Sequence, residues 1–502
     1  MTFSMVRSGR RGPGDATAAI ARTAGSHAGS AGSAGAAGTA AASSAGVAGW
    51  IAALCLPLAV LGCSGTHGTA GSAPATMAVA GDFAPGDVAS RDAAAAQANV
   101  AGPAGPAEMA AGRPSPVPPV PKDRALAQVM ITLAPAPPPL WEQITRDLER
   151  TYRLRTLFAW SMQSLGERRI VFDAPRDRPI EALLRRLSSD PRVELAQPVQ
   201  RFATQASHAP SLQVPLQHSA QVLRLAQAHR WATGKGVRIA VIDTGVDVEH
   251  PELRGQIVKI GNFVELGGRA DPSFNSDIHG TAVAGVIAAA LNSDLGLVGV
   301  APQAQVFALK ACWQERPGAR EAVCDSYTLS KAIDFAITQG AQVLNFSLAG
   351  PPDPMIAKLV VAALRRGIVV VAADGPDPAS SFPATQRGVL GVAGSDDLQG
   401  RLRFPARRLA AGTLAAPGVD ILTTVPHGHY DFFSGASFAA AQVSGVVALL
   451  LEREPKLTPV QVAALFHRTA HLIPASSGDP AASIDQIDAC AALAASLGGG
   501  CT

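Results

Sequence analysis

The chain has 502 residues, carries a formal net charge of +3 and contains 16% charged residues. A chain of this length exceeds a single hydrophobic core, so we expect two folded units with additional tails. The positive and negative charges are too evenly balanced for a nucleic-acid-binding surface, so we expect no nucleic-acid partner.

An apolar segment near the N-terminus, residues 47–62, is followed directly by Cys63. It is shorter than the roughly 20 residues that a membrane-spanning helix needs, and it is typical of the hydrophobic core of a secretory signal. Its last residues, Val-Leu-Gly-Cys, resemble a bacterial lipobox, in which Cys63 would be acylated. We therefore expect residues 1–63 to be a signal or lipoprotein segment. The protein would then be exported to the periplasm, outer membrane or cell surface on a lipid anchor, or secreted. The alternative is an ordinary apolar segment with a chance cysteine.

Residues 64–125 are rich in Ala, Gly and Pro and nearly lack aromatic residues. Such a composition cannot bury enough surface to fold, so we expect a disordered tether. The pattern changes in residues 126–205, where hydrophobic periodicity predicts alternating short strands and helices. The expected order is a strand (128–133), a helix (140–154), two strands within 156–172, a helix (180–187) and a strand (192–201). This βαββαβ order indicates a small α+β, ferredoxin-like unit.

After an expected linker at residues 206–217, continuous apolar β-runs alternate with helical segments. These runs lie at residues 237–242, 305–309, 343–347, 368–372 and 389–393. Runs of this kind indicate strands that are buried on both faces, as in a parallel sheet with helices on both sides. We therefore expect an α/β unit with its active site at the carboxyl ends of the strands.

Three short motifs carry candidate catalytic residues. Asp243 ends the first β-run, His279 lies in His-Gly-Thr at the start of a small-residue helix, and Ser437 lies in Gly-Ala-Ser before an apolar helix. A carboxylate can orient a histidine that takes the proton of a serine hydroxyl during attack on a carbonyl. A serine at a helix N-terminus also has a free backbone N–H that can bind negative charge. Each residue has a structural alternative: a turn cap for Asp243, a packed histidine for His279 and a helix cap for Ser437.

The order Asp, His, Ser is that of subtilisin, and residues 222–497 resemble the subtilisin-like serine proteases. The resemblance implies that the backbone of Ser347, Leu348, Ala349 and Gly350 pairs with an extended peptide substrate. It also implies that residues 126–205 are a propeptide that assists folding and inhibits the enzyme through a tail in the active site. Residues 206–497 would then be the peptidase domain, followed by a C-terminal tail, residues 498–502.

The chain departs from the family at the side chain that stabilises the oxyanion. The family carries an Asn shortly after the strand that corresponds to residues 368–372. Here the ungapped alignment places Pro376 at that position, and Pro has neither a side-chain amide nor a backbone N–H. With a gap, the Asn is deleted before Asp374. In subtilisin, removal of this donor lowers turnover roughly 100- to 1000-fold.

Four cysteines follow the presumed signal: Cys312, Cys324, Cys490 and Cys501. Their spacing suits two local disulfides in an oxidising compartment, and the sequence alone leaves cross-pairing open. Spacings typical of zinc ligands are absent. The pair His427 and His429 is more typical of a solvated turn, so we expect no metal and no cofactor.

The sequence thus favours a serine endopeptidase that is made as a zymogen and acts on extended peptides. The missing Asn motivates an alternative, a degenerate subtilase that binds peptides or a partner without efficient turnover. A non-proteolytic hydrolase such as an esterase is a third possibility.

Overall fold

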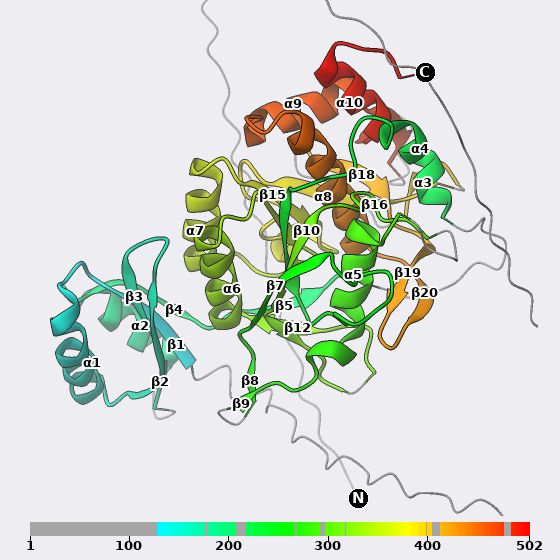
Figure 1. Cartoon of the computed structure of the whole chain (residues 1–502). Helices are drawn as coiled ribbons and strands as arrows, with labels where there is room; N and C mark the ends of the chain where they lie inside the picture. The colour runs from blue at the N-terminus through cyan, green and yellow to red at the C-terminus, as the bar shows by residue number, and fades with distance from the viewer. Residues whose placement is uncertain are drawn as a thin grey trace, which may run out of the picture. The chain divides into compact units, whose positions relative to one another are not determined.

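The computed structural model describes residues 128–501 apart from 176–178, 207–216, 267–268, 292–296, 317, 398, 404–411 and 476–482 (Figure 1). All of these residues belong to one compact unit, Met109–Thr502. The predicted signal segment, the lipidation of Cys63 and the tether lie outside the described residues.

The first part of the described chain has the predicted βαββαβ order. Its elements are β1 (Gln128–Leu133), α1 (Pro138–Tyr152), β2 (Arg155–Met162), β3 (Glu167–Asp173), α2 (Ile180–Ser188) and β4 (Val193–Pro198). The strands form an antiparallel sheet in the order β2-β3-β1-β4. The two helices pack their apolar side chains, such as Leu148 and Leu183, against Ile131 and Phe172 of the sheet.

The final strand of this unit differs from the prediction. A single strand was expected at residues 192–201, but β4 ends at Pro198 and a separate strand, β5, spans Arg201–Thr204. The two strands belong to different sheets, because β5 pairs with β12 and β14 of the following part of the chain. Pairing partners distant in sequence therefore divide what reads locally as one β-run.

The main sheet of the second part is largely parallel. Its strand order is β21-β22-β18-β16-β15-β13-β6-β10-β7, with β17 beside β16. These strands are β6 (Arg238–Asp243), β7 (Ile257–Asn262), β10 (Gln305–Lys310), β13 (Val343–Phe346), β15 (Val369–Ala373), β16 (Leu390–Asp396), β17 (Arg401–Leu402), β18 (Leu414–Pro417), β21 (His471–Pro474) and β22 (Ser483–Gln486). The five predicted β-runs match β6, β10, β13, β15 and β16 to within a few residues.

Helices cover both faces of this sheet, as expected for strands that are buried on both sides (Figure 1). On one face lie α5 (Ile278–Ala288) and α8 (Ala436–Arg453), which share a core with alternate strand residues such as Val371. On the other face α6 (Ser326–Thr338) and α7 (Pro354–Arg365) pack on the intervening residues, such as Val370. Helix α8 is apolar and long enough to span a membrane by composition, but it is the central core helix.

Smaller elements complete the fold. They are α3 (His218–Val222), α4 (Leu225–Ala228), β8 (Glu265–Leu266), β9 (Arg269–Ala270), η2 (Phe274–Ser276), β11 (Cys312–Trp313), β12 (Val323–Asp325), β14 (Leu348–Ala349), η3 (Pro378–Ser380), β19 (Ile421–Val425), β20 (His429–Phe433), α9 (Pro459–Thr469) and α10 (Ala489–Leu497). Strands β11, β12, β5 and β14 form one small sheet in that order.

Candidate active site

Asp243 and His279 are brought into contact by the end of β6 and the start of α5. The Nδ1 atom of His279 lies 2.7 Å from Oδ1 of Asp243, and both side chains are completely buried. The backbone N–H of Thr244 donates to the same carboxylate oxygen at 2.7 Å. This contact fixes the imidazole orientation and leaves Nε2 as its other edge. The Nε2 atom is buried and has no hydrogen-bond partner among the described residues.

Gly280 explains how the histidine helix comes so close to the sheet. A Cβ atom at this position would lie 2.5 Å from the carbonyl oxygen of Gly245, which is closer than real Cβ atoms approach. The N–H of Gly280 also donates to Oγ1 of Thr244 at 2.8 Å. The small residue after His279 is therefore required by the backbone contact that places the imidazole beside Asp243.

Ser437 lies in the first turn of α8 and is completely buried. Its backbone N–H donates to the carbonyl oxygen of Gln205 at 3.1 Å. A Cβ atom on Gly435 would lie 2.2 Å from that same oxygen, so glycine here admits a peptide carbonyl to the helix N-terminus. This arrangement is the one needed to stabilise negative charge on a carbonyl oxygen.

The hydroxyl of Ser437 is engaged by backbone groups. It donates to the carbonyl oxygen of Ser347 at 2.8 Å, and it accepts the N–H of Gln205 at 3.0 Å. With the hydroxyl turned to Ser347, the Nε2 atom of His279 stays without a partner among the described residues. The Ser437 hydroxyl and the His279 imidazole are therefore not hydrogen bonded to each other in this form of the chain.

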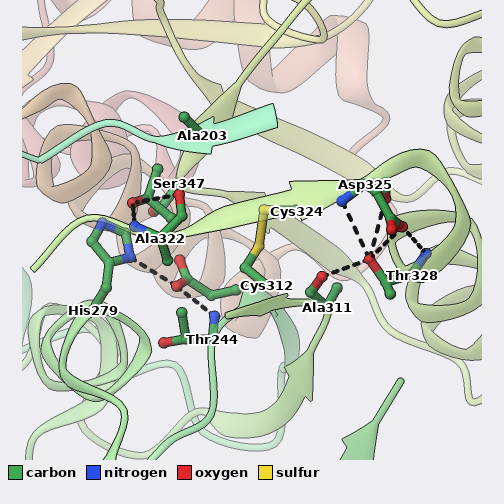
Figure 2. The surroundings of a disulfide bond; sticks show 12 residues. Ala203, Thr244, His279, Ala311, Cys312, Ala322, Cys324, Asp325, Thr328 and Ser347 are labelled. Atoms are coloured by element: carbon green, nitrogen blue, oxygen red, sulfur yellow. Dashed lines mark hydrogen bonds and ion pairs between the residues drawn. A yellow bond between two sulfur atoms is a disulfide. The ribbon is translucent and has the colours of Figure 1, made fainter. Parts of the chain in front are cut away.

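Strand β5 of the chain itself lies between β12 and β14, the latter within the segment Ser347 to Gly350. We call the space between β12 and β14 that β5 fills the groove. Strand β14 pairs antiparallel with β5, with Leu348 opposite Thr204 and Ala349 opposite Ala203. On the other side β12 pairs antiparallel with β5, so β5 is an inner strand of the small sheet. Figure 2 shows Ala203 on this strand, together with Ser347 and Ala322 from the neighbouring segments. An extended segment thus leads directly to Ser437, as strand addition by a peptide substrate would.

Phe202 is the anchor of this inserted strand. Its side chain is 2% exposed, and its ring centroid lies 6.3 Å from that of Phe382. A Cβ atom on Gly350 would lie 2.4 Å from Cδ1 of Phe202. The absence of a side chain at Gly350 therefore makes room for an aromatic ring, a role that the sequence pattern did not reveal.

Sequence reasoning also missed a buried ion cluster beneath the site. Lys310, at the end of β10, is completely buried and pairs with Asp277 and, at 3.1 Å, with Asp271. Asp277 also accepts the N–H of Gly245 at 2.8 Å. Burial raises the pKa of Asp277, and the Lys310 ammonium opposes that rise. The cluster holds the turn after Asp243 against the start of α5. Its only signal in the sequence is a charged residue at the end of an apolar strand.

The segment that should carry the oxyanion side chain contains a buried carboxyl. Asp374 is 6% exposed, and its Oδ2 atom has no hydrogen-bond partner among the described residues. Burial raises its pKa. Asn345 is the nearest candidate substitute, but its amide donates to Oγ of Ser347 at 3.0 Å and its Oδ1 accepts from Ser444 at 2.9 Å. Its polar atoms therefore support β13 and α8, not the carbonyl of Gln205.

A cavity of about 270 Å³ lies at the start of α5, next to Ile278. Its lining comes from the start of α5, the loop between β11 and β12, and the β19–β20 hairpin: Ser276, Ile278, Arg320, Val425, Pro426, His427, Asp431 and Phe433. Arg320 is ion-paired with Asp431, and its guanidinium lies 4.6 Å from the Phe433 ring centroid. The pair joins the loop between β11 and β12 to strand β20.

The four predicted cysteines form the two local disulfides, Cys312–Cys324 and Cys490–Cys501. The first links β11 to β12 at the groove (Figure 2). The second ties α10 to the residues that follow it. The structure therefore has the two local disulfides and not the cross-paired ones that the sequence left open.

An open parallel α/β sheet that presents Asp, His and Ser, in that chain order, at its carboxyl edge defines a subtilisin-like serine protease. The sequence profile of the subtilase family matches residues 234–488, about half of the chain. Subtilisin BL from Lederbergia lenta is 34% identical over 246 residues, which are 48% of this chain and 86% of the relative. Subtilisin from Bacillus pumilus is 34% identical over 245 residues, 47% of this chain and 85% of the relative. The chain belongs to the subtilase family.

Solved structures agree on the fold. Fervidolysin from Fervidobacterium pennivorans, described as a keratinolytic enzyme related to subtilisin, matches with a TM-score of 0.60 at 23% identity. The match covers 73% of this chain and 60% of fervidolysin. Homologues in the subtilase family are serine endopeptidases, and the chain is accordingly a subtilisin-like serine protease.

Proposed function

We propose that the protein is a serine endopeptidase, made as a zymogen, in which Asp243, His279 and Ser437 form the catalytic triad. The observation that carries this proposal is the hydrogen bond from the Ser437 N–H to the carbonyl oxygen of Gln205 at 3.1 Å. In this hydrogen bond the carbonyl group of Gln205 lies next to Ser437, as the carbonyl group of a substrate peptide would. The bond to be cleaved first is then Gln205–Ala206, within the chain itself.

The reaction follows from the contacts of these residues. His279 Nε2 takes the proton of the Ser437 hydroxyl as the oxygen attacks the carbonyl carbon of Gln205. Asp243, bound to Nδ1 at 2.7 Å, stabilises the imidazolium. The Ser437 N–H stabilises the negative charge on the carbonyl oxygen. His279 then returns the proton to the nitrogen of Ala206 as the peptide bond breaks, and water hydrolyses the acyl-enzyme with His279 as base.

Residues 126–205 act, in this proposal, as a propeptide that holds the enzyme inactive before cleavage. Beyond the inserted strand, Asp334 on α6 accepts the N–H groups of Gln163 and Ser164 at 3.0 and 2.7 Å. Gln197 donates to Asp353 at the start of α7 at 2.7 Å. These bonds support a docked propeptide whose tail occupies the groove that a substrate needs.

The enzyme's other partners are then extended peptides or unfolded protein segments, which add a strand between β12 and β14. A lipid on Cys63 would anchor the exported protein to a membrane through the tether. A single backbone donor at the oxyanion predicts slow turnover, because subtilisin loses roughly 100- to 1000-fold without its side-chain donor.

N-terminal sequencing of the mature protein tests the proposal, with wild type compared to Ser437→Ala. Wild type should yield a new N-terminus at Ala206, and the variant should remain uncut when refolded in purified form. A Cys63 lipid would appear as a blocked N-terminus with an acyl mass on the uncut chain. Identical cutting of both purified proteins would contradict self-cleavage.

The alternative, a degenerate subtilase that binds peptides or a partner, is favoured only by the missing Asn. Labelling with a fluorophosphonate separates the two functions. A labelled wild type and an unlabelled Ser437→Ala variant support the peptidase. Correctly processed wild type that takes no label, yet still binds peptides, supports the binding protein.

A further inference from the structure

Strand β12 is the second wall of the substrate groove. It pairs antiparallel with β5 over its whole length, with Val323 opposite Ala203 and Cys324 opposite Phe202. Just before it, the carbonyl oxygen of Ala322 accepts the N–H of Thr204 at 3.0 Å. This wall therefore contacts the second to fourth residues before the cleaved bond.

The wall is a short strand, and apart from β5 it pairs only with the shorter strand β11 among the described strands. β12 has three residues, and its other neighbour, β11, has two. A ladder of this length is marginal by itself, and a groove without a bound peptide lacks the pairing that β5 supplies. Something else must hold β12 in register when the groove is open.

The disulfide Cys312–Cys324 joins these two strands at opposed positions. Cys312 follows Ala311, whose N–H donates to the carbonyl oxygen of Asp243 at 2.8 Å. The bond thus connects the groove wall to the strand end beside the catalytic carboxylate. The far end of β12 has its own anchor, because Thr328 donates to the Ala311 carbonyl oxygen at 2.6 Å and caps α6 together with Asp325 (Figure 2).

We propose that the disulfide Cys312–Cys324 is a positioning element for catalysis: it keeps β12 ordered, so that the residues before the cleaved bond bind to a preformed wall. This inference rests on the proposed peptidase function and adds a specific role to it. Without the cross-link, each long substrate must order the wall as it binds, and this cost reduces its affinity. A substrate with only one residue before the cleaved bond does not contact the wall, so its affinity should not depend on the disulfide.

The test uses two substrates taken from the chain's own sequence. One is succinyl-Phe-Ala-Thr-Gln-p-nitroanilide, which copies residues 202–205. The other is acetyl-Gln-p-nitrophenyl ester, which lacks the three residues that reach β12. In mature Cys312→Ala/Cys324→Ala, KM for the long substrate should rise about 10-fold, which corresponds to about 1.4 kcal/mol of binding free energy. The value of kcat/KM for the ester should change less than about two-fold, which is less than about 0.5 kcal/mol.

The second disulfide supplies a matched control. Cys490→Ala/Cys501→Ala removes a cross-link of similar loop length at α10, and should lower thermal stability while leaving the ratio between the two substrates unchanged. If the groove variant loses both substrates equally, the disulfide only stabilises the fold and the inference is wrong. If that variant does not fold, Cys312→Ala/Cys324→Val replaces it, because Val fills more of the buried space that the disulfide leaves. Its activity on the long anilide is then compared with its activity on the ester in the same way. Wild type that cleaves neither substrate would overturn the proposed function itself.

Discussion

At the scale of single residues, we predict that stabilisation of the oxyanion limits the rate of this enzyme. The N–H of Ser437 reaches the Gln205 carbonyl oxygen, whereas the amide of Asn345 is committed to Ser347. Asp374, in the segment where the resemblance leads us to expect the family's Asn, is a buried carboxyl, and burial raises its pKa. In the proposed mechanism, stabilisation of the developing charge therefore rests on the backbone N–H of Ser437.

Restoring the side-chain donor should raise turnover. Replacing Asp374-Gly375-Pro376 by Ala-Gly-Asn introduces an amide at the position where the family carries it. We expect kcat on the tetrapeptide anilide to rise about 100-fold, since a donor of this kind contributes that much in subtilisin. The control is Pro376→Ala, which relaxes the loop without adding an amide and should give no gain. Equal gains from both variants would show that loop strain, and not the missing amide, limits the rate.

At the scale of elements, the chain fills the groove between β12 and β14 with its own strand, β5, and so completes a small sheet. β5 lies between β12 and β14, and Phe202 enters the space that Gly350 leaves open. If the protein is the proposed peptidase, we predict that its selectivity depends on the side chain at the fourth residue before the cleaved bond.

Gly350→Ala should narrow that space. The new Cβ would fall 2.4 Å from the position of the Phe202 ring, so substrates with Phe at this place should lose about 10-fold or more in kcat/KM. A substrate with Ala there serves as the internal control and should be cleaved almost as well as by wild type. An equal loss on both substrates would mean that the variant distorts β14 and does not narrow the pocket.

The elements also show what a local pattern can and cannot predict. β1 and the five inner strands were predicted from apolar runs, because burial on both faces leaves that trace in the sequence. The division between β4 and β5 was not predicted, because it is set by pairing with β12 and β14. The same holds within the site. Asp243, His279 and Ser437 stand in recognisable local motifs, whereas the Lys310–Asp277 pair and the Gly350 space exist only through contacts between distant segments.

At the scale of the whole molecule, the two parts of the chain are joined by polar contacts as well as by the inserted strand. Arg169 is completely buried and lies 3.4 Å from both Ser330 on α6 and Glu167. Asp334 accepts two N–H groups of the β2–β3 turn. Because a hydrogen bond to a charged group contributes about 1.5–3 kcal/mol, the two bonds to the Asp334 carboxylate favour the docked state.

Asp334→Ala should therefore weaken the docked state. With two N–H groups left unpaired, we expect the cut propeptide to dissociate about 10-fold faster or more. The measurement is the lag before activity appears after self-cleavage. Glu315→Ala is a suitable control, because it removes a partly exposed ion pair with Arg201 at 3.4 Å and exposed pairs contribute little. A lag of unchanged length in Asp334→Ala would show that β5 alone holds the propeptide.

Helix α3 and strand β22 meet at Asp397, and this contact gives the molecule a pH dependence. Oδ2 of Asp397 lies 3.7 Å from His218 of α3, and Oδ1 accepts from Gln486 of β22 at 3.1 Å. Burial raises the pKa of Asp397 to about 6, from a usual value of 3.8. Burial also lowers the pKa of His218, although Asp420 and Asp396 oppose this, so the histidine is neutral at alkaline pH and does not balance an ionised carboxylate.

The sign of the effect follows from the direction of the shift. A carboxyl whose pKa is higher in the folded state stabilises the fold below pH 3.8 and loses that contribution as the pH rises through 6. Asp397→Asn keeps the acceptor for Gln486 and removes the charge, so its unfolding free energy at pH 8 should exceed that of wild type by about 1–3 kcal/mol. The two proteins should be equally stable near pH 4. Urea unfolding in a Ser437→Ala background, which prevents self-digestion, gives both values.

The control is Asp396→Asn, which breaks a contact with Arg403 at 3.7 Å and should give no stabilisation at pH 8. An Asp397→Asn variant with the same pH profile as wild type would mean that this carboxylate stays ionised and solvated when the protein is folded.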